Sequence, residues 1–363
     1  MFDCIIIGAG IAGIVTARTM LEAGMNIAVI DDSWKSSASR VAAGLVNPIT
    51  GKRFQVSWRY DEFLALAKIN YASFSKQDSE SDYIKPCSMI RLFVDEKEVQ
   101  TFHDKYDMLN PEHYVGQQYA PHCNDLHPSL RNEYGGFKTL QAYVFDYNRF
   151  LNVSALVLGD KLISSHIEPG DISTNNGTWV VRSEKGELHA KTILFCDGWL
   201  ASKNSWLNHM QLQFDIVKGE LCIIKSHDLP VTDIISRGFA IMPIGDKKFR
   251  CAATFQWNDY TTIPTEFGSE RLEQRIKSLI TCQYEVLEQS AGIRPTMLHH
   301  KPFIGEHPHK RGLFAIGGLG TKGALYAPYM AKQFTSHFMN DTPFDKEMDI
   351  AECTSAYHVM YGE

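Results

Sequence analysis

The order of apolar and polar positions at the start of the chain predicts a strand, a turn, a helix and a second strand. Residues 3–7 form a short continuous apolar run, which is typical of a strand buried in a parallel sheet. Residues 12–23 carry apolar side chains at helical spacing, and Gly24 follows where such a helix would end. Residues 26–30 form the next apolar run, which stops at Asp31. We therefore expect two parallel strands joined by a helix.

The middle of the chain has a different pattern, with partial alternation between apolar and polar residues. Turn signals separate these segments, so the pattern indicates antiparallel strands. The segments are residues 88–96, 215–226, 239–244 and 249–255. Residues 178–198 read as a hairpin, with its turn at Lys185 and Gly186, followed by a buried strand.

A second strand–turn–helix pattern lies near the other end of the chain. The sequence GLFAIGG, residues 312–318, predicts a strand, and KGALYAPYMAKQFTSHF, residues 322–338, predicts a helix. The turn between them is rich in glycine but has no second G-x-G-x-x-G spacing. A second diphosphate site is therefore not expected there.

The composition is that of a globular protein. Hydrophobic residues make up 44% of the 363 positions and charged residues 21%, and the net charge is −6. This charge favours neither nucleic acid nor an anionic membrane, which leaves only a local basic patch open. No apolar run approaches the length of a membrane span and no export signal is evident, so we expect a cytoplasmic protein. The eight cysteines include no C-x-x-C pair and are expected to be free thiols.

The first glycine-rich turn, GAGIAG at residues 8–13, has the chemistry of a dinucleotide site. Gly8 permits a tight turn, Gly10 lets the backbone approach a diphosphate, and Gly13 lets the helix pack closely on the strand. The helix N-terminus offers N–H groups to the phosphates. Asp31 can accept hydrogen bonds from an adenosine ribose, which disfavours NADP. The turn alone does not choose between NAD and FAD, and a purely structural glycine turn is the alternative.

Two further segments favour FAD. Residues 36–53, SSASRVAAGLVNPITGKR, are rich in small residues that would let the backbone approach a flat ligand. At the second turn, a helix N-terminus would stabilise the negative charge of a reduced flavin ring. Lys322 would add a full positive charge there, and a solvated lysine at the helix start is the alternative. We therefore expect the first turn to hold the diphosphate and the second to hold the redox ring.

Four motifs together resemble the D-amino acid oxidase (DAO) family of FAD-dependent oxidoreductases. They are GAGIAG with Asp31, ASRVAAGL, AGIRPTMLHHKPFIG and GGLGTKGALYAP, and they span nearly the whole chain. Two branches look most similar: glycine oxidase, and the FAD oxidase half of the bifunctional enzyme that matures 5-methylaminomethyl-2-thiouridine in tRNA. SRVAAGLVNP and GTKGALYAP look more like the second branch, whose methyltransferase half is absent here.

The resemblance implies an α/β fold of two interleaved domains. A Rossmann-like FAD-binding domain would use residues 1–80, 140–206 and 288–363. A smaller α+β substrate domain, built on a mostly antiparallel sheet, would use residues 81–139 and 207–287.

The resemblance also implies cofactor-binding positions along the whole chain. FAD should be non-covalent, because no cysteine stands where covalently flavinylated relatives carry theirs. The implied positions are Gly8, Gly10, Ile11, Ala12, Gly13, Asp31, Asp32, Ser39, Arg40, Ala43, Gly44, Leu45, Ile167, Gly198, Leu319, Gly320, Thr321, Lys322, Gly323 and Ala324.

Three residues are the candidates for catalysis. Arg294, in GIRP, stands where glycine oxidase grips the substrate carboxylate; a structural ion pair or backbone clamp is the alternative. Arg250 stands near the position of an oxygen-activating lysine in some amine-oxidising relatives, and Lys322 lies at the second turn. The implied reaction oxidises the C–N bond of a small amine or amino acid, such as glycine, sarcosine or a D-amino acid. Hydride would pass to flavin N5, the imine would hydrolyse, and oxygen or another acceptor would take the electrons, with peroxide expected from oxygen.

Two other functions stay open. The first is oxidation of a carboxymethylaminomethyl group on a tRNA wobble uridine, which predicts a basic rim built from Lys52, Arg53, Lys247, Lys248, Arg250, Lys310 and Arg311. The second is an FAD module that passes electrons to a partner protein.

The chain departs from the family pattern at two places. His299 stands where the family commonly has Asp, and FCDGWLAS brings Cys196 and Asp197 into a turn that is usually AAG. The histidines His299, His300, His307 and His309 have no Cys or carboxylate at ligand spacing, so no metal site is expected. One of them acting as a general base stays open.

Overall fold

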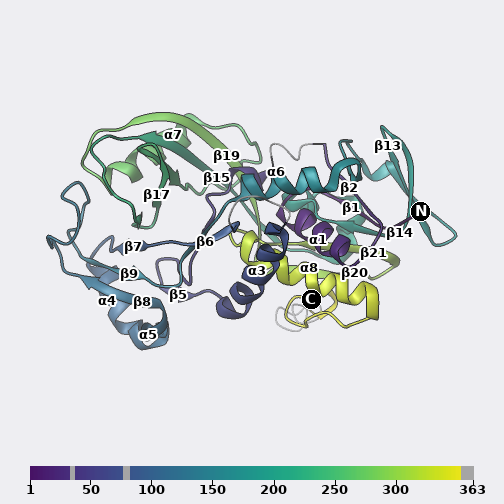
Figure 1. Ribbon diagram of the computed structural model, residues 1–363, viewed down its shortest axis with the longest axis horizontal. Helices are drawn as coiled ribbons and strands as arrows, with labels where there is room; N and C mark the ends of the chain where they lie inside the picture. The colour runs from purple at the N-terminus through teal and green to yellow at the C-terminus, as the bar shows by residue number, and fades with distance from the viewer. Residues whose placement is uncertain (33–36, 77–81, 353–363) are drawn as a thin grey trace.

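A computed structural model describes residues 1–32, 37–76 and 82–352 of the chain. Ser36, at the start of the predicted small-residue segment, lies outside these residues. Figure 1 shows two sheet regions side by side, with the helices α1, α3 and α8 beside the sheet that contains the N-terminal strand. Among the described residues, no helix combines the length and the apolar composition needed to cross a bilayer.

The first sheet has a parallel core that joins the N-terminal strand to a strand from the last quarter of the chain. The strand order is β11–β2–β1–β14, and β21 pairs parallel with the last part of β14. Strands β12 and β13 continue the sheet along the first part of β14, and β20 pairs antiparallel with β21. The bounds are β1 (Phe2–Ile7), β2 (Ile27–Ile30), β11 (Leu162–Ile163), β12 (Ile172–Asn175), β13 (Thr178–Ser183), β14 (Gly186–Phe195), β20 (Phe303–His307) and β21 (Lys310–Gly317).

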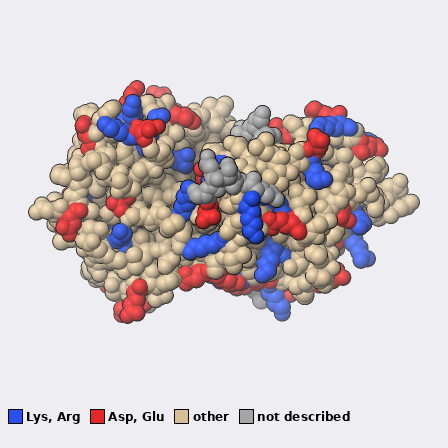
Figure 2. All heavy atoms as spheres, viewed as in Figure 1, with Lys and Arg blue, Asp and Glu red and all other residues tan. Residues whose placement is uncertain are grey.

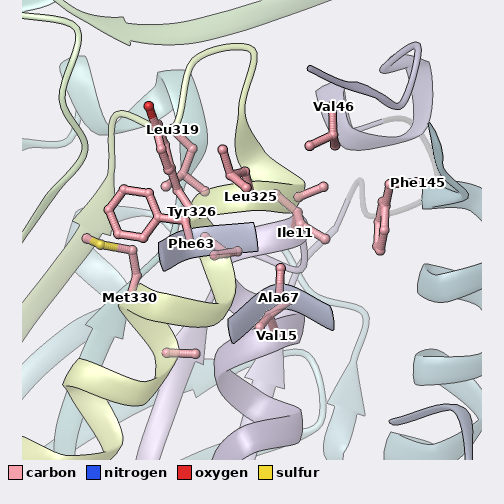
Figure 3. Close-up of a cluster of buried hydrophobic side chains, with 14 of the residues drawn as sticks. Ile11, Val15, Val46, Phe63, Ala67, Phe145, Leu319, Leu325, Tyr326 and Met330 are labelled. Atoms are coloured by element: carbon pink, nitrogen blue, oxygen red, sulfur yellow. The ribbon is translucent and has the colours of Figure 1, made fainter. Parts of the chain in front are cut away.

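Helices α1 (Ile11–Glu22), α3 (Tyr60–Ser75) and α8 (Gly323–Asn340) pack together beside this sheet. In Figure 3, Val15, Ala67 and Met330, one from each helix, lie in the same buried cluster. These three side chains have essentially no exposed surface. The packing places the first turn of α1 beside the first turn of α8, which positions both glycine-rich turns.

Helix α8 contains a proline, and a buried tyrosine compensates for it. Pro328 has no N–H and cannot bond to the carbonyl of Ala324 one turn earlier. The hydroxyl of Tyr71, on α3, donates to that carbonyl over 2.9 Å. Tyr71 is fully buried, so the hydrogen bond stabilises the start of α8 from the side of α3.

The second sheet is mostly antiparallel and has the order β19–β15–β18–β17–β16–β7–β9–β8. Only β16 and β7 pair parallel among its described neighbours. The bounds are β7 (Met89–Leu92), β8 (Val115–Tyr119), β9 (Gly136–Thr139), β15 (Phe214–Lys225), β16 (Ile234–Ser236), β17 (Ala240–Gly245), β18 (Lys248–Ala252) and β19 (Glu285–Met297).

Shorter elements complete the fold. Strands β3 (Leu45–Val46), β10 (Tyr143–Phe145) and β6 (Ile84–Pro86) form a small sheet, and β4 (Ile49–Thr50) pairs with β5 (Gln55–Val56). The remaining α-helices are α2 (Ala38–Val41), α4 (Glu96–Lys105), α5 (Pro111–Tyr114), α6 (Tyr147–Leu158) and α7 (Glu266–Lys277).

The long strand β19 bears on the predicted domain boundaries. It pairs with β15 from Met297 opposite Phe214 to Glu285 opposite Lys225. Residues 288–297 were expected in the FAD-binding domain, but by hydrogen bonding they belong to the second sheet. The division into two domains stays a prediction.

Candidate active site

A cavity of about 910 Å³ is lined by residues of both large sheets and of both glycine-rich turns. Its wall includes the turn between β1 and α1, the segment that contains α2 and β3, and the turn between β21 and α8. Strands β15 and β19 supply residues from the antiparallel sheet. Segments about 300 residues apart in sequence therefore meet at one site.

The first turn is shaped by its glycines. Gly8 has a φ of +104°, and a Cβ there would overlap the backbone carbonyl of Cys196. A Cβ at Gly13 would overlap the carbonyl of Gly8, so both glycines are required by close packing. At Gly10 the nearest atom to an added Cβ would be Ser39 Oγ at 3.5 Å, and this glycine lines the cavity.

Acidic and hydroxyl side chains hold this turn in place. The N–H of Ala9 donates to Asp31 Oδ2 over 2.6 Å, and the N–H of Ile11 donates to Ser39 Oγ over 3.0 Å. Asp32 pairs with His166 Nδ1 at 2.6 Å, and this hydrogen bond raises the pKa of His166. Asp31 and Asp32 both line the cavity, at the end of β2.

The second turn touches the first. A Cβ at Gly323 would lie 2.8 Å from Ile11 Cγ2, so the starts of α8 and α1 are in close contact. The N–H of Gly320 donates to Pro295 O over 3.2 Å, which ties this turn to β19. Lys322 lines the cavity, and burial lowers the pKa of its ammonium group. No acidic side chain of the described residues pairs with Lys322.

Arg294, on β19, is a buried cation in the cavity wall. Its guanidinium lies against Gly219 of β15, where any Cβ would overlap it. Its Nη1 donates to Thr254 O over 3.2 Å, and its guanidinium carbon lies 4.7 Å from the ring centre of Phe255. Burial lowers the pKa of Arg294 to about 10. No carboxylate of the described residues forms an ion pair with it, whereas its hydrogen bond to Thr254 O is a backbone contact of the kind expected from the alternative of a backbone clamp.

Most of the predicted cofactor positions reach the cavity. Those that line it are Gly8, Gly10, Ile11, Ala12, Asp31, Asp32, Ser39, Ala43, Gly44, Leu45, Ile167, Gly198, Leu319, Gly320, Thr321, Lys322, Gly323 and Ala324.

Three predicted residues are not brought to the cavity wall. Gly13 packs against the backbone of Gly8 instead. Arg40 donates to the carbonyl of Asn148 and to Asn152 Oδ1 on α6. Arg250 was expected to be catalytic, but its Nη1 donates to Ala43 O over 3.1 Å, behind the residues that line the cavity. Its side chain ties β18 to the small-residue segment, and a catalytic role for Arg250 stays a prediction.

The predicted histidines also lie away from the cavity wall. His299 and His300 follow β19 in a turn in which His300 has a φ of +59°. His307 and His309 pack with His209, with ring centres 5.8–6.0 Å apart. Over residues 1–32, 37–76 and 82–352, no group of three or more His, Cys, Asp or Glu side chains is arranged to hold a metal ion.

The basic residues predicted for a rim are spread over the molecule. Lys310 and Arg311 begin β21, and the other end of that strand, Gly317, lines the cavity. Lys248 begins β18, and Ala252 at its other end lines the cavity. Figure 2 shows acidic and basic side chains interspersed on the face it displays.

The sequence did not predict the hydrogen bonds made by two polar residues of the cavity wall. Asp197 accepts a hydrogen bond from Asn204 Nδ2 over 2.7 Å, and burial raises its pKa to about 7. Tyr147 accepts one from the N–H of Ala324. The departure from AAG in FCDGWLAS was a signal for Asp197. The contact of Tyr147 joins residues 177 positions apart, and no local pattern indicates it.

Comparison with known proteins identifies the family. The model of the DAO family, described as FAD dependent oxidoreductase, matches residues 3–337. Glycine oxidase of Geobacillus kaustophilus (strain HTA426) is 26% identical over 168 residues, which is 45% of this chain and 44% of that protein. The tRNA 5-methylaminomethyl-2-thiouridine biosynthesis bifunctional protein MnmC of Marinobacter nauticus is 21% identical over 374 residues, 90% of this chain and 54% of that protein. These alignments span about half the length of the two relatives.

A solved structure shows the same fold. The crystal structure of glycine oxidase from Geobacillus kaustophilus superposes with a TM-score of 0.82 at 19% identity, covering 95% of this chain and 96% of that one. The comparisons confirm the expected fold class and confirm FAD as the cofactor.

The cavity fits this cofactor. Gly8 and Gly44 have positive φ angles, and a Cβ at either would overlap a backbone carbonyl, so only glycine allows the close backbone packing that forms this part of the wall. The first turns of α1 and α8 both line the cavity. The cavity volume is within the range of cofactor sites. The chain belongs to the DAO family of FAD-dependent oxidoreductases.

Proposed function

We propose that this chain oxidises the C–N bond of a small amine that bears a carboxylate, such as glycine, sarcosine or a D-amino acid. The observation that carries the proposal is Arg294, a buried cation in the cavity wall without a carboxylate partner among the described residues. A planar guanidinium can bind both oxygens of a carboxylate. The names of the glycine oxidase relatives support the same substrate class.

The surroundings of Arg294 hold its side chain ready for that role. Gly219 leaves room for the guanidinium, Thr254 O accepts one N–H, and Phe255 covers one face. A side chain fixed in this way loses little conformational freedom when it binds a carboxylate. The apolar residues Leu221, Ala240 and Met242 also line the cavity and make this part of its wall apolar.

FAD supplies the two-electron oxidation chemistry at this site. Lys322 and the first turn of α8 place positive charge at the second glycine-rich turn, where negative charge would be stabilised. Oxygen is the proposed final electron acceptor, which makes peroxide the second product. Hydrolysis of the product imine in water completes the proposed reaction.

The test is an anaerobic screen of amines for loss of flavin absorbance, followed by admission of air and a peroxide assay. Carboxylated amines are expected to bleach the flavin, and matched amines without a carboxylate are not. In Arg294→Met, we expect the KM for the carboxylated amine to rise at least 100-fold with FAD retained. An unchanged KM would exclude Arg294 from the site, and absence of peroxide in air would favour the module that passes electrons to a partner protein.

A second candidate substrate is a carboxymethylaminomethyl group on a tRNA wobble uridine. Two aromatic residues near the cavity favour it: the half-buried Trp199 lines the cavity, and its ring is nearly parallel to that of the exposed Tyr260, 6.2 Å away. Lys203 Nζ lies 4.7 Å from the Trp199 ring centre. Flat exposed rings beside a cation are typical of surfaces that stack nucleobases. Turnover of a tRNA that carries this group, without turnover of free amines, would select this candidate.

A further inference from the structure

Tyr147 is a buried polar side chain in the cavity wall to which the sequence motifs assign no role. It begins α6, is 8% exposed and lines the cavity. Its hydroxyl oxygen accepts a hydrogen bond from the N–H of Ala324 over 2.9 Å. Ala324 is in the first turn of α8, where N–H groups have no partner within the helix. The tyrosine therefore takes one of the N–H groups that the helix would otherwise present to a ligand.

The hydroxyl proton of Tyr147 has no acceptor among the described residues. A tyrosine hydroxyl can accept and donate at the same time. Burial raises the pKa of Tyr147 to about 12, so the proton is present throughout the neutral range. Because buried polar groups are nearly always hydrogen-bonded, this donor indicates an acceptor that the protein itself does not supply.

The position of the hydroxyl indicates which part of the cofactor it meets. A Cβ at Gly323 would lie 3.2 Å from the Tyr147 oxygen and 2.8 Å from Ile11 Cγ2. The hydroxyl is therefore close to the contact between the first turn of α8 and the first turn of α1. Asp31 and the Asp32–His166 pair lie at the end of β2, where the adenosine half is expected.

We propose that Tyr147 donates its hydroxyl proton to an oxygen in the flavin half of FAD, on the ribityl chain or its phosphate. The proposal rests on the FAD chemistry of the family and not on the identity of the substrate. A hydroxyl that accepts from a helix N–H becomes a stronger donor, because neighbouring hydrogen bonds polarise one another. Tyr147 would thus link the partial positive charge at the N-terminus of α8 to the cofactor through two consecutive hydrogen bonds.

The chain offers a matched control. The hydroxyl of Tyr71 also forms a hydrogen bond with Ala324, but it donates to the Ala324 carbonyl. Tyr71 is fully buried and does not line the cavity. Replacing either tyrosine by phenylalanine therefore removes one hydroxyl contact to the same residue, and only Tyr147→Phe removes a donor from the cavity.

The experiment measures binding of FAD, FMN and AMP to the FAD-stripped full-length protein. For Tyr147→Phe we expect the Kd for FAD and for FMN to rise at least tenfold, with the Kd for AMP, which lacks the whole flavin half, within twofold of the wild type. For Tyr71→Phe we expect all three constants within twofold. Thermal unfolding of both FAD-stripped variants measures how much the loss of each hydrogen bond to Ala324 destabilises the fold.

Three results would overturn the proposal. They are an unchanged Kd for FAD in Tyr147→Phe, an equal loss in Tyr71→Phe, or a loss of AMP affinity as large as that of FMN. The second would mean that α8 is merely loosened, and the third that the contact lies in the adenosine half. None of these measurements uses an amine, so their outcome is independent of the proposed substrate.

Discussion

At the residue scale, Gly219 is the position where the smallest change should alter the substrate site. Gly219→Ala would add a methyl group where the Arg294 guanidinium now lies. The backbone there is not in the left-handed region, so the fold should accept alanine. We expect the KM for a carboxylated amine to rise at least tenfold, with FAD affinity unchanged.

Steady-state kinetics over a range of amine concentrations, with flavin absorbance as the measure of bound FAD, check this prediction. Gly177→Ala is a poor control, because its φ is positive. Gly170→Ala is suitable, because an added Cβ there meets no atom within 4 Å. Equal kinetics for Gly219→Ala and the wild type would show that the function of Arg294 does not depend on the absence of a side chain at Gly219.

Asp197 gives a prediction about pH. Its pKa rises from 3.8 to about 7, chiefly because burial disfavours the charged form. The folded protein then keeps a proton that the unfolded chain releases, so stability falls as the pH rises from about 4 to about 7. The single group accounts for up to about 4 kcal/mol over this window.

Denaturant unfolding of the FAD-free protein at several pH values, compared with Asp197→Asn, measures this contribution. Asparagine keeps a carbonyl that can accept from Asn204 and cannot titrate. The difference in unfolding free energy between variant and wild type should therefore grow with pH in favour of the variant. A difference that is constant from pH 4 to pH 7 would contradict the raised pKa.

At the element scale, a buried lysine holds the loop that follows β18. Lys218 of β15 is fully buried, and its Nζ donates to Asp259 Oδ2 and to Ile263 O, each over 2.7 Å. The same loop brings Phe255 and Thr262 to the cavity. The loop is thus attached to the back of the strand whose Gly219 faces Arg294.

Lys218→Met should release this loop. The loss leaves Asp259 without its buried partner and should cost about 3 kcal/mol of unfolding free energy. Limited proteolysis should then cut within residues 253–265, and the KM for the amine should rise. Lys277→Met is the control, because Lys277 pairs with Glu273 on the exposed face of α7 and should matter little. Equal protease resistance in the two variants would show that Lys218 does not anchor the loop.

Elements differ in how far the sequence alone defines them. The first turn could be predicted because its strand, glycines and acidic residue lie within 31 consecutive positions. The parallel pairing of β16 with β7 could not, because it joins segments some 145 residues apart. The resemblance placed Arg250 near a catalytic position, but a match in sequence does not tell which face of β18 meets the cavity, and the side chain instead donates to Ala43 O.

At the scale of the whole molecule, the four motifs predicted the convergence of the two chain ends, since each motif was expected to bind a different part of one long ligand. The contacts of Tyr147 and Arg294 depend instead on how helices and strands from distant segments pack. Only the tertiary structure shows these contacts. The guanidinium of Arg294 lies against Gly219, and the hydroxyl of Tyr147 accepts from the N–H of Ala324.

This convergence predicts how FAD should affect unfolding. Both sheets and both glycine-rich turns line one cavity, so FAD bound there would contact elements from the whole chain. FAD at 100 times its Kd should stabilise the protein by about 2.7 kcal/mol. We expect a single unfolding transition that moves upward with FAD, measured by fluorescence and by circular dichroism on the stripped and reloaded protein. ADP at 100 times its own Kd is the control for mass action. We expect it to give the same shift as FAD, but at a higher total concentration of ligand. Two separate transitions, of which FAD moves one, would show that only one sheet holds the cofactor.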